Sequence, residues 1–376
     1  MHSRSARTLH SVQRKVRTLT EATKDRHLLM ALPICLTVIG LFFIFEASSV
    51  DAYRTFGDSF YFFKQQAMWM VIGIIAMALI GRMDYRFITK FAGAGLITTL
   101  ILLILVLIPG IGRDTLGARR RIDLGFMQLQ PTELAKLTMT VYLASWLQKK
   151  HPGKFLYFLL LLGSVIGLVM IQPDMGTTLI LIGIFLGMYT LSGEPFRNLL
   201  MIAPFGIATL IALIVTSPYR FQRLMTFMNP MFDPQGISYH VNQIFISLAS
   251  GGILGRGFSA SRQKYQFLPE AHTDSIFAII GEEFGFVGAV ILITLYAVLL
   301  LSLYKIAHKA PDKLGYLLAG GVMVLIALQM ILNLGGMTAL VPLTGVPLPF
   351  VSYGGASLVI LYSLIGIAVS VGRKSK

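Results

Sequence analysis

The chain has 376 residues, of which 55% are hydrophobic and 13% charged, and its mean hydropathy is +0.73. Because a soluble domain carries about 25% charged residues, this composition excludes a soluble globular protein and indicates an integral membrane protein. The single cysteine, Cys35, excludes both a disulfide framework and a cysteine-based metal site.

Apolar stretches recur along the whole chain at the length a bilayer requires, which is roughly 20 residues for a hydrocarbon core of about 30 Å. They predict an all-α integral membrane protein with about ten transmembrane helices. The predicted spans are 28–47, 66–81, 88–108, 132–148, 155–171, 176–192, 198–216, 275–304, 314–334 and 353–371. No stretch is long and polar enough for a separate soluble domain, so residues 28–372 are predicted to form a single membrane domain.

The formal net charge of +15 fixes the orientation, because basic residues beside membrane spans stay in the cytoplasm. Lys and Arg concentrate in residues 1–27, in alternate connections and in residues 373–376, which places both termini in the cytoplasm. The basic tail 1–27 is interpreted as a disordered topogenic or anionic-lipid-binding arm rather than a nucleic-acid site. A cleaved signal peptide is disfavoured, because the first apolar run is longer than a signal core of about 7 to 15 residues.

The same orientation places most acidic residues outside the cell or at the outer ends of spans. These residues are Asp51, Asp58, Asp114, Asp123, Asp174, Asp233, Glu270 and Asp274. Two outer loops are long, 109–131 and 217–274, and the second connects the seventh and eighth predicted spans. Its apolar stretch "VNQIFISLASGGILG" predicts an interfacial helix. Function is therefore expected on the outer face, where the two loops meet.

In the first outer loop, "GARRRIDLG" contains three consecutive arginines, Arg119, Arg120 and Arg121. Basic residues are disfavoured on the outer side, so a compensating group is expected. Phosphate is one candidate, because guanidinium groups donate forked hydrogen bonds to phosphate oxygens. Pairing with Asp114, with Asp123 or with lipid headgroups is an equally good interpretation.

Two further sites carry charge near the outer ends of spans. Glu133 and Lys136 in "QPTELAKL" stand three residues apart and share a helix face if the span begins at Pro131. Each charge inside a span costs roughly 2.5 to 3.5 kcal/mol of insertion free energy. Such a pair is therefore expected to face the bundle interior, either as part of a functional site or as a structural ion pair. In "IQPDMGTT", Asp174 is expected to cap the following helix.

The densest acidic stretch is "LPEAHTDSIFAIIGEEFG", residues 268–285. Asp274 precedes an apolar run, so it is either a helix cap or a general base, because partial burial raises a carboxylate pKa towards neutrality. Glu270 ends the loop. Glu282 and Glu283 follow two turns into the helix, where no cap needs them, and one of them is expected to face a polar cavity opposite Lys136.

Four blocks of the sequence resemble the SEDS family of bacterial shape, elongation, division and sporulation proteins. They are "GARRRIDLGFMQLQPTELAKL", "QPDMGTTL", "LPEAHTDSIFAIIGEEFG" and "VPLTGVPLPFVSYGGASL". The blocks occur in the family's order and spacing across most of the chain. Within the family, "PEAHTD" and "EASSVDAYRTFGDSFYFFKQQ" resemble the division member FtsW more than the elongation member RodA.

The resemblance implies a ten-span peptidoglycan glycosyltransferase that polymerises lipid II, an undecaprenyl pyrophosphate-linked disaccharide pentapeptide, at the outer face of the cytoplasmic (inner) membrane. By motif position it implies that Asp274 is the catalytic base. Glu133 and Lys136 match intramembrane polar residues, Arg119 and Lys264 are candidates for pyrophosphate contacts, and Glu270 and Glu283 complete the expected substrate site.

The resemblance also implies partners: a class B penicillin-binding protein transpeptidase and, for FtsW-like members, membrane proteins of the division complex at the septum. A requirement for Mg²⁺ or Mn²⁺ stays open, and no protein metal ligands are predicted. Three alternatives remain beside the septal polymerase. They are a RodA-like polymerase for elongation, a lipid II flippase and a noncatalytic scaffold, and the crowding of acidic residues at the outer rim favours a polymerase over the last two.

Overall fold

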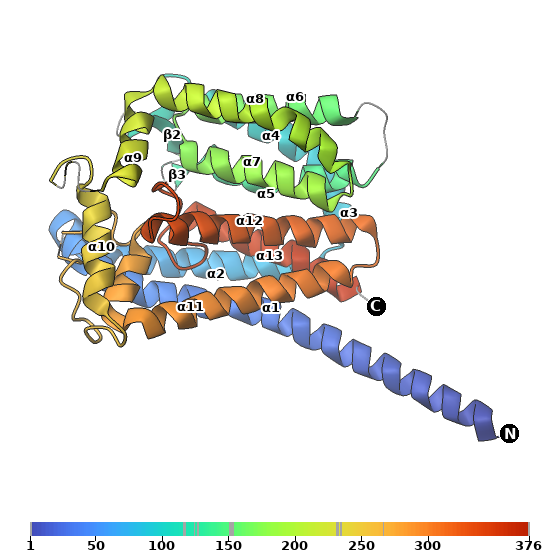
Figure 1. The fold of residues 1–376 in the computed structure, drawn as a ribbon. Coiled ribbons are helices and arrows are strands. Elements are labelled where there is room, and N and C mark those ends of the chain that lie inside the picture. The colour runs from blue at the N-terminus through green and yellow to red at the C-terminus, as the bar shows by residue number, and fades with distance from the viewer. Residues whose placement is uncertain are drawn as a thin grey trace.

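The computed structural model describes residues 2–115, 118–123, 125, 128–149, 154–230, 233, 235–265 and 267–374. The elements, in chain order, are α1 (His2–Phe56), α2 (Tyr61–Arg82), α3 (Tyr85–Ile88), the 3-10 turn η1 (Thr89–Phe91), α4 (Ala92–Leu105), β1 (Gly112–Thr115), β2 (Ala118–Asp123), β3 (Gln128–Leu129), α5 (Pro131–Leu147), α6 (Lys154–Ile171), α7 (Met175–Leu191), α8 (Phe196–Val215), α9 (Pro218–Met228), α10 (Tyr239–Gly251), α11 (Ile276–His308), α12 (Lys313–Met337) and α13 (Gly355–Lys374). Figure 1 shows long helices running side by side, with both termini at one end of the bundle.

Within the described residues, eight helical segments are long and apolar enough to cross a membrane. They are Thr23–Phe56, Tyr61–Arg82, Tyr85–Leu105, Lys154–Ile171, Phe196–Val215, Ile276–His308, Lys313–Met337 and Gly355–Lys374. Helices α5 and α7 have 17 residues each and run alongside them (Figure 1). Seventeen residues lie at the lower limit for a bilayer span. The ten predicted spans are therefore present, and the all-α membrane fold is confirmed.

Local sequence signals set several helix starts. Pro131 occupies the first turn of α5, where its missing N–H costs no hydrogen bond. Asp174 caps α7 as predicted, with its Oδ1 accepting from the backbone N of Thr177 at 3.0 Å. Asp312 caps α12 in the same way, accepting from Gly315 N at 2.8 Å.

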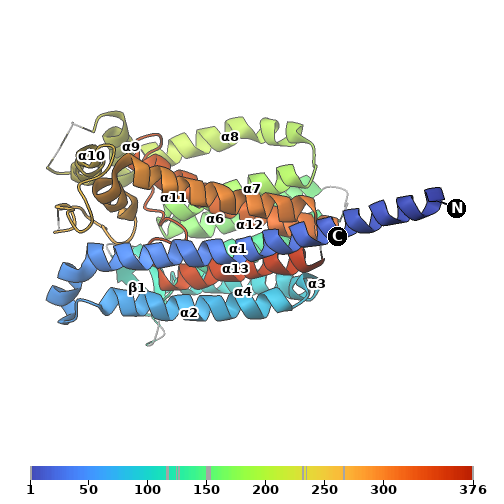
Figure 2. The same cartoon turned by 90° about the horizontal axis from the view of Figure 1, so that it is seen from below.

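The core lies between α13, α12, α2, α5 and α7, and α13 is the most buried of the long spans. Helices approach closely where small residues allow it: a Cβ on Gly73 of α2 would lie 2.4 Å from the ring of Tyr362 on α13. Figure 2 shows α13 between α1 and α2. In contrast, the apolar window of α8 buries no residue against the rest of the chain, so its side chains face outward.

The first helix is longer than predicted at both ends. The tail 1–27 was expected to be disordered, but residues from His2 onward continue α1, which is a correction. The sequence contains no Gly or Pro between residues 2 and 32, and extending a formed helix costs less than nucleating one. At the other end α1 runs past residue 47 to Phe56 and ends before Gly57, whose φ of +71° suits a helix terminus.

The outer loop 109–131 contains a three-stranded antiparallel sheet of order β1-β2-β3, which the sequence did not predict. In its register Asp114 of β1 lies opposite Arg119 of β2. The strands are short, and the arginine run hides any alternation of apolar and polar residues, so the usual strand signal is missing.

The outer loop 217–274, between α8 and α11, folds into α9 and α10 at the end opposite the termini (Figure 1). The helix predicted in this loop is present as α10 (Tyr239–Gly251), and its position at the membrane interface stays a prediction. Its Ser247 Oγ donates to the carbonyl of Ala278 on α11 at 3.0 Å. This hydrogen bond fixes the loop to the first turn of α11.

Helix α11 is broken at Gly285, where φ is +61° and ψ is −158°. The backbone around the break pairs with the segment after α10: Arg256 N donates to Glu282 O at 3.0 Å, and Phe286 N donates to Gly252 O at 2.9 Å. A Cβ on Gly285 would lie 2.3 Å from Gly255 N, so only glycine fits this crossing. The break thus locks the loop over the outer end of α11.

Candidate active site

Asp274 lies at the outer end of the bundle, two residues before α11. Its backbone carbonyl accepts from Asn333 Nδ2 of α12 at 2.8 Å, and the same amide donates to the carbonyl of Val346 at 2.8 Å. Asn333 therefore ties the chain at Asp274 to α12 and to the loop between α12 and α13. The position of the carboxylate is set by three separate parts of the sequence.

The Asp274 side chain is not a helix cap. The residue at the start of α11 is Ser275, which makes no side-chain cap bond, and Thr273 Oγ1 donates to Glu270 Oε2 at 2.6 Å. Among the described residues, no hydrogen bond to the Asp274 carboxylate is present. Gly345, with φ of +70°, faces it: a Cβ there would lie 3.2 Å from Asp274 Oδ2. Glycine at this position leaves the carboxylate open.

Burial raises the pKa of Asp274 from its usual value to about 6. The negative charges of Glu270 and Asp174 raise this pKa further, whereas the positive charge of Arg223 lowers it. The side chain is half-buried, so it remains accessible to a ligand. A carboxylate with a pKa near 6 is mostly ionised at neutral pH and is well suited to accept a proton there.

A pocket of about 300 Å³ lies between α9, α10 and the end of α12 with the loop after it. Asp274 does not line this pocket, but the charge of the lining residue Arg223 acts on the Asp274 carboxylate. The polar lining of the pocket includes Arg223, Thr226 and His240. Arg223 Nη1 donates to the carbonyl of Leu343 at 2.8 Å, which holds the guanidinium group at the pocket wall. The remaining lining is mostly apolar, as is typical of ligand pockets.

His240 connects the pocket to the start of α11. Its Nε2 lies 2.7 Å from the hydroxyl of Ser275, the residue next to Asp274. Burial lowers the pKa of His240 to about 4, so the imidazole is neutral at physiological pH. Two buried polar atoms nearby, Asn333 Oδ1 and Thr344 Oγ1, have no hydrogen-bond partner among the described residues. Unsatisfied buried groups beside a pocket are typical of a binding site.

Sequence reasoning missed Arg223, His240 and Asn333. Each belongs to a different segment, and the loop 217–274 gave only a general signal for function, through its length and its glycine, proline and aromatic content. Glu270, which was predicted, is exposed with φ of +50° and accepts from Thr273. It contributes charge near Asp274 and holds the end of the loop.

Glu133 and Lys136 form the predicted ion pair on one face of α5. Lys136 Nζ lies 2.7 Å from Glu133 Oε1, and the two residues are 2% and 6% exposed. Glu133 Oε2 is buried without a partner among the described residues. Because one carboxylate oxygen is left over, the pair is not a fully satisfied structural bridge.

Lys264 is enclosed by protein acceptors. Its ammonium group lies 2.6 Å from Glu46 Oε2, 3.3 Å from Glu283 Oε1 and 2.9 Å from the carbonyl of Ser259. This network joins α1, the loop before Asp274 and α11. The expected pyrophosphate contact from Lys264 is not supported, because these three acceptors already use the three N–H donors of its ammonium group.

The two glutamates of α11 serve the same loop. Glu282 accepts from Ser261 Oγ at 2.5 Å and from Arg262 N at 3.1 Å, and Glu283 pairs with Lys264. The expected position of Glu282 or Glu283 opposite Lys136 is therefore corrected: Lys136 pairs with Glu133 instead. The break at Gly285 explains the difference, because it brings the loop against this turn of α11.

The three arginines of β2 contact the protein in different ways. Arg120 donates to the carbonyls of Gln172 and Pro173 at 3.0 and 2.5 Å, and Arg121 donates to Gln128 Oε1 at 3.2 Å. Arg119 is half-buried and also interacts within the protein. Arg120 thus connects the sheet to the turn before α7. Among the described residues, no group of three or more His, Cys, Asp or Glu side chains could hold a metal ion.

Fold and site together define a polytopic membrane protein with a candidate catalytic carboxylate, a nearby pocket and guanidinium groups at one end of a ten-helix bundle. The family model described as cell cycle protein FtsW/RodA/SpoVE matches residues 26–376. The chain therefore belongs to the FtsW/RodA/SpoVE family of cell cycle proteins.

Individual relatives cover almost the whole chain. Stage V sporulation protein E of Bacillus subtilis is 36% identical over 95% of this chain and 99% of its own length. A probable peptidoglycan glycosyltransferase FtsW of Geobacter metallireducens is 35% identical over 95% and 97%. Among solved structures, a chain of a peptidoglycan synthase complex has a TM-score of 0.76 at 29% identity, covering 92% of this chain and 96% of its own. RodA of Thermus thermophilus has a TM-score of 0.68 at 27% identity, covering 92% and 96%.

Proposed function

We propose that this protein is a peptidoglycan glycosyltransferase that polymerises lipid II into glycan strands at the outer face of the cytoplasmic membrane. The observation that carries the proposal is the open, half-buried carboxylate of Asp274 near the pocket at the outer end. Relatives that are named probable peptidoglycan glycosyltransferases support the reaction class.

The proposed step joins two lipid-linked sugars. A hydroxyl of the acceptor sugar attacks the anomeric carbon of the donor and forms the new glycosidic C–O bond. The bond from that carbon to the pyrophosphate oxygen breaks, and polyprenyl pyrophosphate leaves with the electron pair, so the anomeric configuration inverts. Asp274 takes the hydroxyl proton, for which its pKa of about 6 is suitable.

The leaving pyrophosphate requires positive charge near the reacting carbon. Arg223 is the stronger candidate, because it lines the pocket and its charge acts on Asp274. Arg119 of β2 is the second candidate. Glu133 and Lys136 are proposed to shape the polar interior of the site. Glu283 and Lys264 are proposed to position the loop that ends at Asp274.

Purified protein in detergent should convert labelled lipid II into glycan strands with inverted anomeric configuration. A muramidase should digest these strands. A flippase is the alternative, since a buried charge pair also suits a transport path. Transfer of fluorescent lipid II across vesicle walls is therefore measured in parallel. Flipping without glycan synthesis would replace the proposed function by transport.

We propose a class B penicillin-binding protein transpeptidase as the partner, and the division complex at the septum as the place of action, with cell elongation as the alternative. The similar chain of known structure belongs to a peptidoglycan synthase complex that coordinates polymerization and crosslinking. The lipid-facing sides of α11 and α12 offer one surface for a partner's single span. Exposed apolar residues there are Val290, Ile291, Ile293, Leu301 and Ile331.

Replacement of Ile291 and Leu301 by Trp is expected to reduce co-purification of the transpeptidase, because bulky rings disrupt helix packing. The matched control places Trp at Phe205 and Ile207, which are exposed on α8. Co-purification that survives the changes on α11 and is lost with those on α8 would move the interface to α8.

A further inference from the structure

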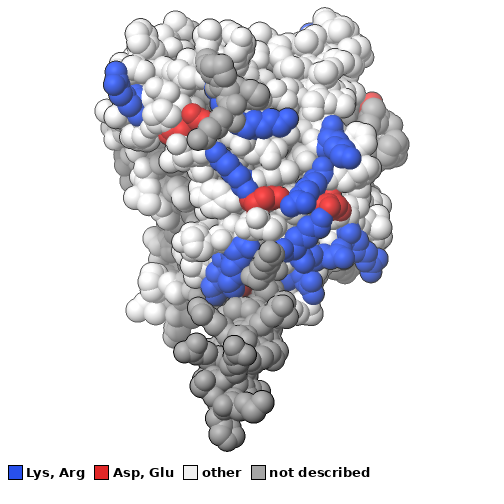
Figure 3. Space-filling model, turned by 90° about the vertical axis from the view of Figure 1, so that its right-hand side faces the viewer, with Lys and Arg blue, Asp and Glu red and all other residues white. Residues whose placement is uncertain are grey.

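Lys and Arg side chains gather at the end of the bundle that carries the termini (Figure 3), opposite the end where α9 and α10 lie (Figure 1). One group surrounds the turn between α2 and α3 and the end of α13. Its described cations are Arg82, Arg86, Lys90, Lys313, Arg373 and Lys374, and its acids are Asp84 and Asp312. Six cations and two acids leave a local formal charge of +4. The proposed reaction uses none of these residues.

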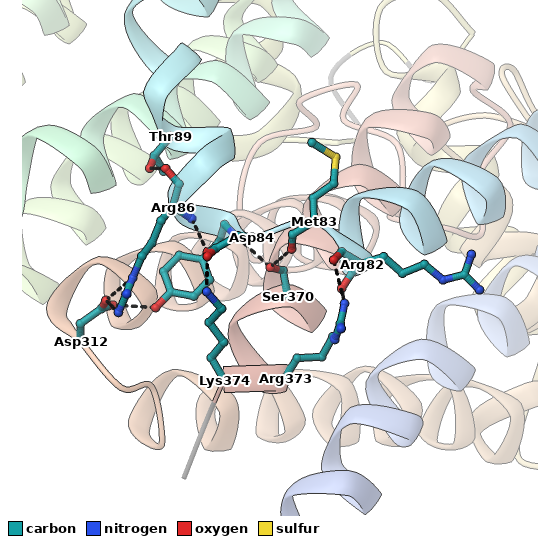
Figure 4. Close-up of polar contacts among 11 residues, drawn as sticks. Arg82, Met83, Asp84, Arg86, Thr89, Asp312, Ser370, Arg373 and Lys374 are labelled. Carbon is teal, nitrogen blue, oxygen red and sulfur yellow. Dashed lines mark hydrogen bonds and ion pairs between the residues drawn. The ribbon is translucent and has the colours of Figure 1, made fainter.

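Both acids of the group are already paired. Lys374 pairs with Asp84, and Arg86 Nη2 lies 2.7 Å from Asp312 Oδ2 (Figure 4). The hydroxyl of Tyr85 also donates to Asp312, at 3.0 Å. The internal ion pairs therefore use two cations, and the positive charge of the others is not compensated by these acids.

Hydrogen bonds from α13 hold the turn in one conformation. Ser370 Oγ donates to the carbonyl of Met83 at 2.6 Å and accepts from Tyr85 N at 3.0 Å. Arg373 Nη1 donates to the carbonyl of Arg82 at 2.8 Å. Figure 4 shows the guanidinium group of Arg82 extending away from this cluster. The backbone that carries Arg82 is thus fixed, while its charged group reaches outward.

Apolar side chains lie in the same segment as the outward cations. Met83, Phe87 and Phe91 are 42%, 46% and 57% exposed. Lys90 Nζ lies 6.0 Å from the centre of the Phe87 ring. Neither Arg82 nor Lys90 has a side-chain hydrogen bond or ion pair within the described part of the chain. Because α2 ends at Arg82, this mixed surface lies where a membrane span meets the headgroup layer.

We propose that Arg82 and Lys90, together with Met83, Phe87 and Phe91, form a binding site for an anionic phospholipid of the inner leaflet. The guanidinium fork of Arg82 and the ammonium group of Lys90 each supply positive charge to headgroup phosphate oxygens. The exposed apolar side chains contact the acyl chains. An acidic soluble protein fits less well, because it would leave these three apolar side chains without a partner.

The test measures lipid retention by native mass spectrometry of the full chain, purified with equal amounts of phosphatidylglycerol and phosphatidylcholine. Wild-type protein should retain phosphatidylglycerol preferentially. Because one basic residue near a membrane changes binding about fivefold, Arg82→Gln and Lys90→Gln should each lower retention about fivefold, and the double variant about 25-fold. Thermal unfolding should be nearly unchanged, since neither side chain makes a hydrogen bond or an ion pair within the described residues.

The matched control is Lys149→Gln with Arg197→Gln, which removes two exposed cations elsewhere on the cytoplasmic end. This variant has the same net charge and should retain phosphatidylglycerol like the wild type. Equal losses in the two double variants would show diffuse attraction and overturn the site. An absence of preference in the wild type would overturn it as well. Glycan synthesis is not the readout, so failure of the proposed function would leave this test intact.

Discussion

Asp274→Asn is expected to lower glycan polymerisation by about 10² to 10⁴, the usual effect of losing a general base. Asparagine has nearly the same shape but does not accept the proton of the acceptor hydroxyl. The alternative role of Asp274 is that of a helix cap. The structure contradicts it, because Asp274 does not cap α11 and its carboxylate makes no hydrogen bond within the described residues. Polymerisation of labelled lipid II is measured at matched protein amounts.

Glu270→Gln is the matched control, because Glu270 lies six residues before the start of α11, whereas Asp274 lies two residues before it. Glu270 is exposed and accepts from Thr273, an interaction that glutamine also makes. Its negative charge raises the pKa of Asp274, so its removal leaves Asp274 ionised at neutral pH. Activity should stay within a few-fold of the wild type. Near-normal synthesis by Asp274→Asn would contradict the base assignment, and an equal loss of lipid II flipping would favour transport.

The second large effect is expected from the buried pair on α5. Lys136→Met leaves the Glu133 carboxylate buried without its countercharge, and breaking a buried ion pair costs about 3 to 5 kcal/mol. The single variant should therefore unfold at a lower temperature and accumulate poorly in the membrane. Thermal unfolding followed by size-exclusion chromatography measures this loss.

The double variant Glu133→Gln with Lys136→Met separates structure from function. Both charges are gone, so the unfolding temperature should recover towards that of the wild type. Polymerisation should remain low, because the polar interior of the site is lost. A double variant that is both stable and fully active would show that the pair is only structural.

The features that sequence predicted are those that a local pattern encodes. Apolar runs of about 20 residues revealed the spans. The three-residue spacing of Glu133 and Lys136 predicted their pairing, and the position of Asp174 before an apolar run predicted its cap. Asp274 could be singled out because it is a carboxylate at the start of a span.

The features that sequence missed depend on contacts between distant segments. Arg223 and His240 come near Asp274 only because α9 lies against the loop after α12 and α10 packs on α11. Lys264 was expected to meet a ligand, but a glutamate from α1 and another from α11 enclose it. The φ of +61° at Gly285, which creates this crossing, cannot be distinguished in sequence from an ordinary glycine within a membrane helix.

The pH dependence of kcat/KM for lipid II polymerisation tests the central claim most directly. Because the base must be ionised and its pKa is about 6, the rate should be nearly constant above about pH 7 and fall about tenfold per unit well below pH 6. Protonation of His240 does not account for this acidic limb, the fall in rate below pH 6, because the pKa of His240 is about 4. The residual activity of Asp274→Asn should lack the limb. A wild-type rate that stays level down to pH 5, or an unchanged limb in Asp274→Asn, would contradict the assignment of Asp274 as the base.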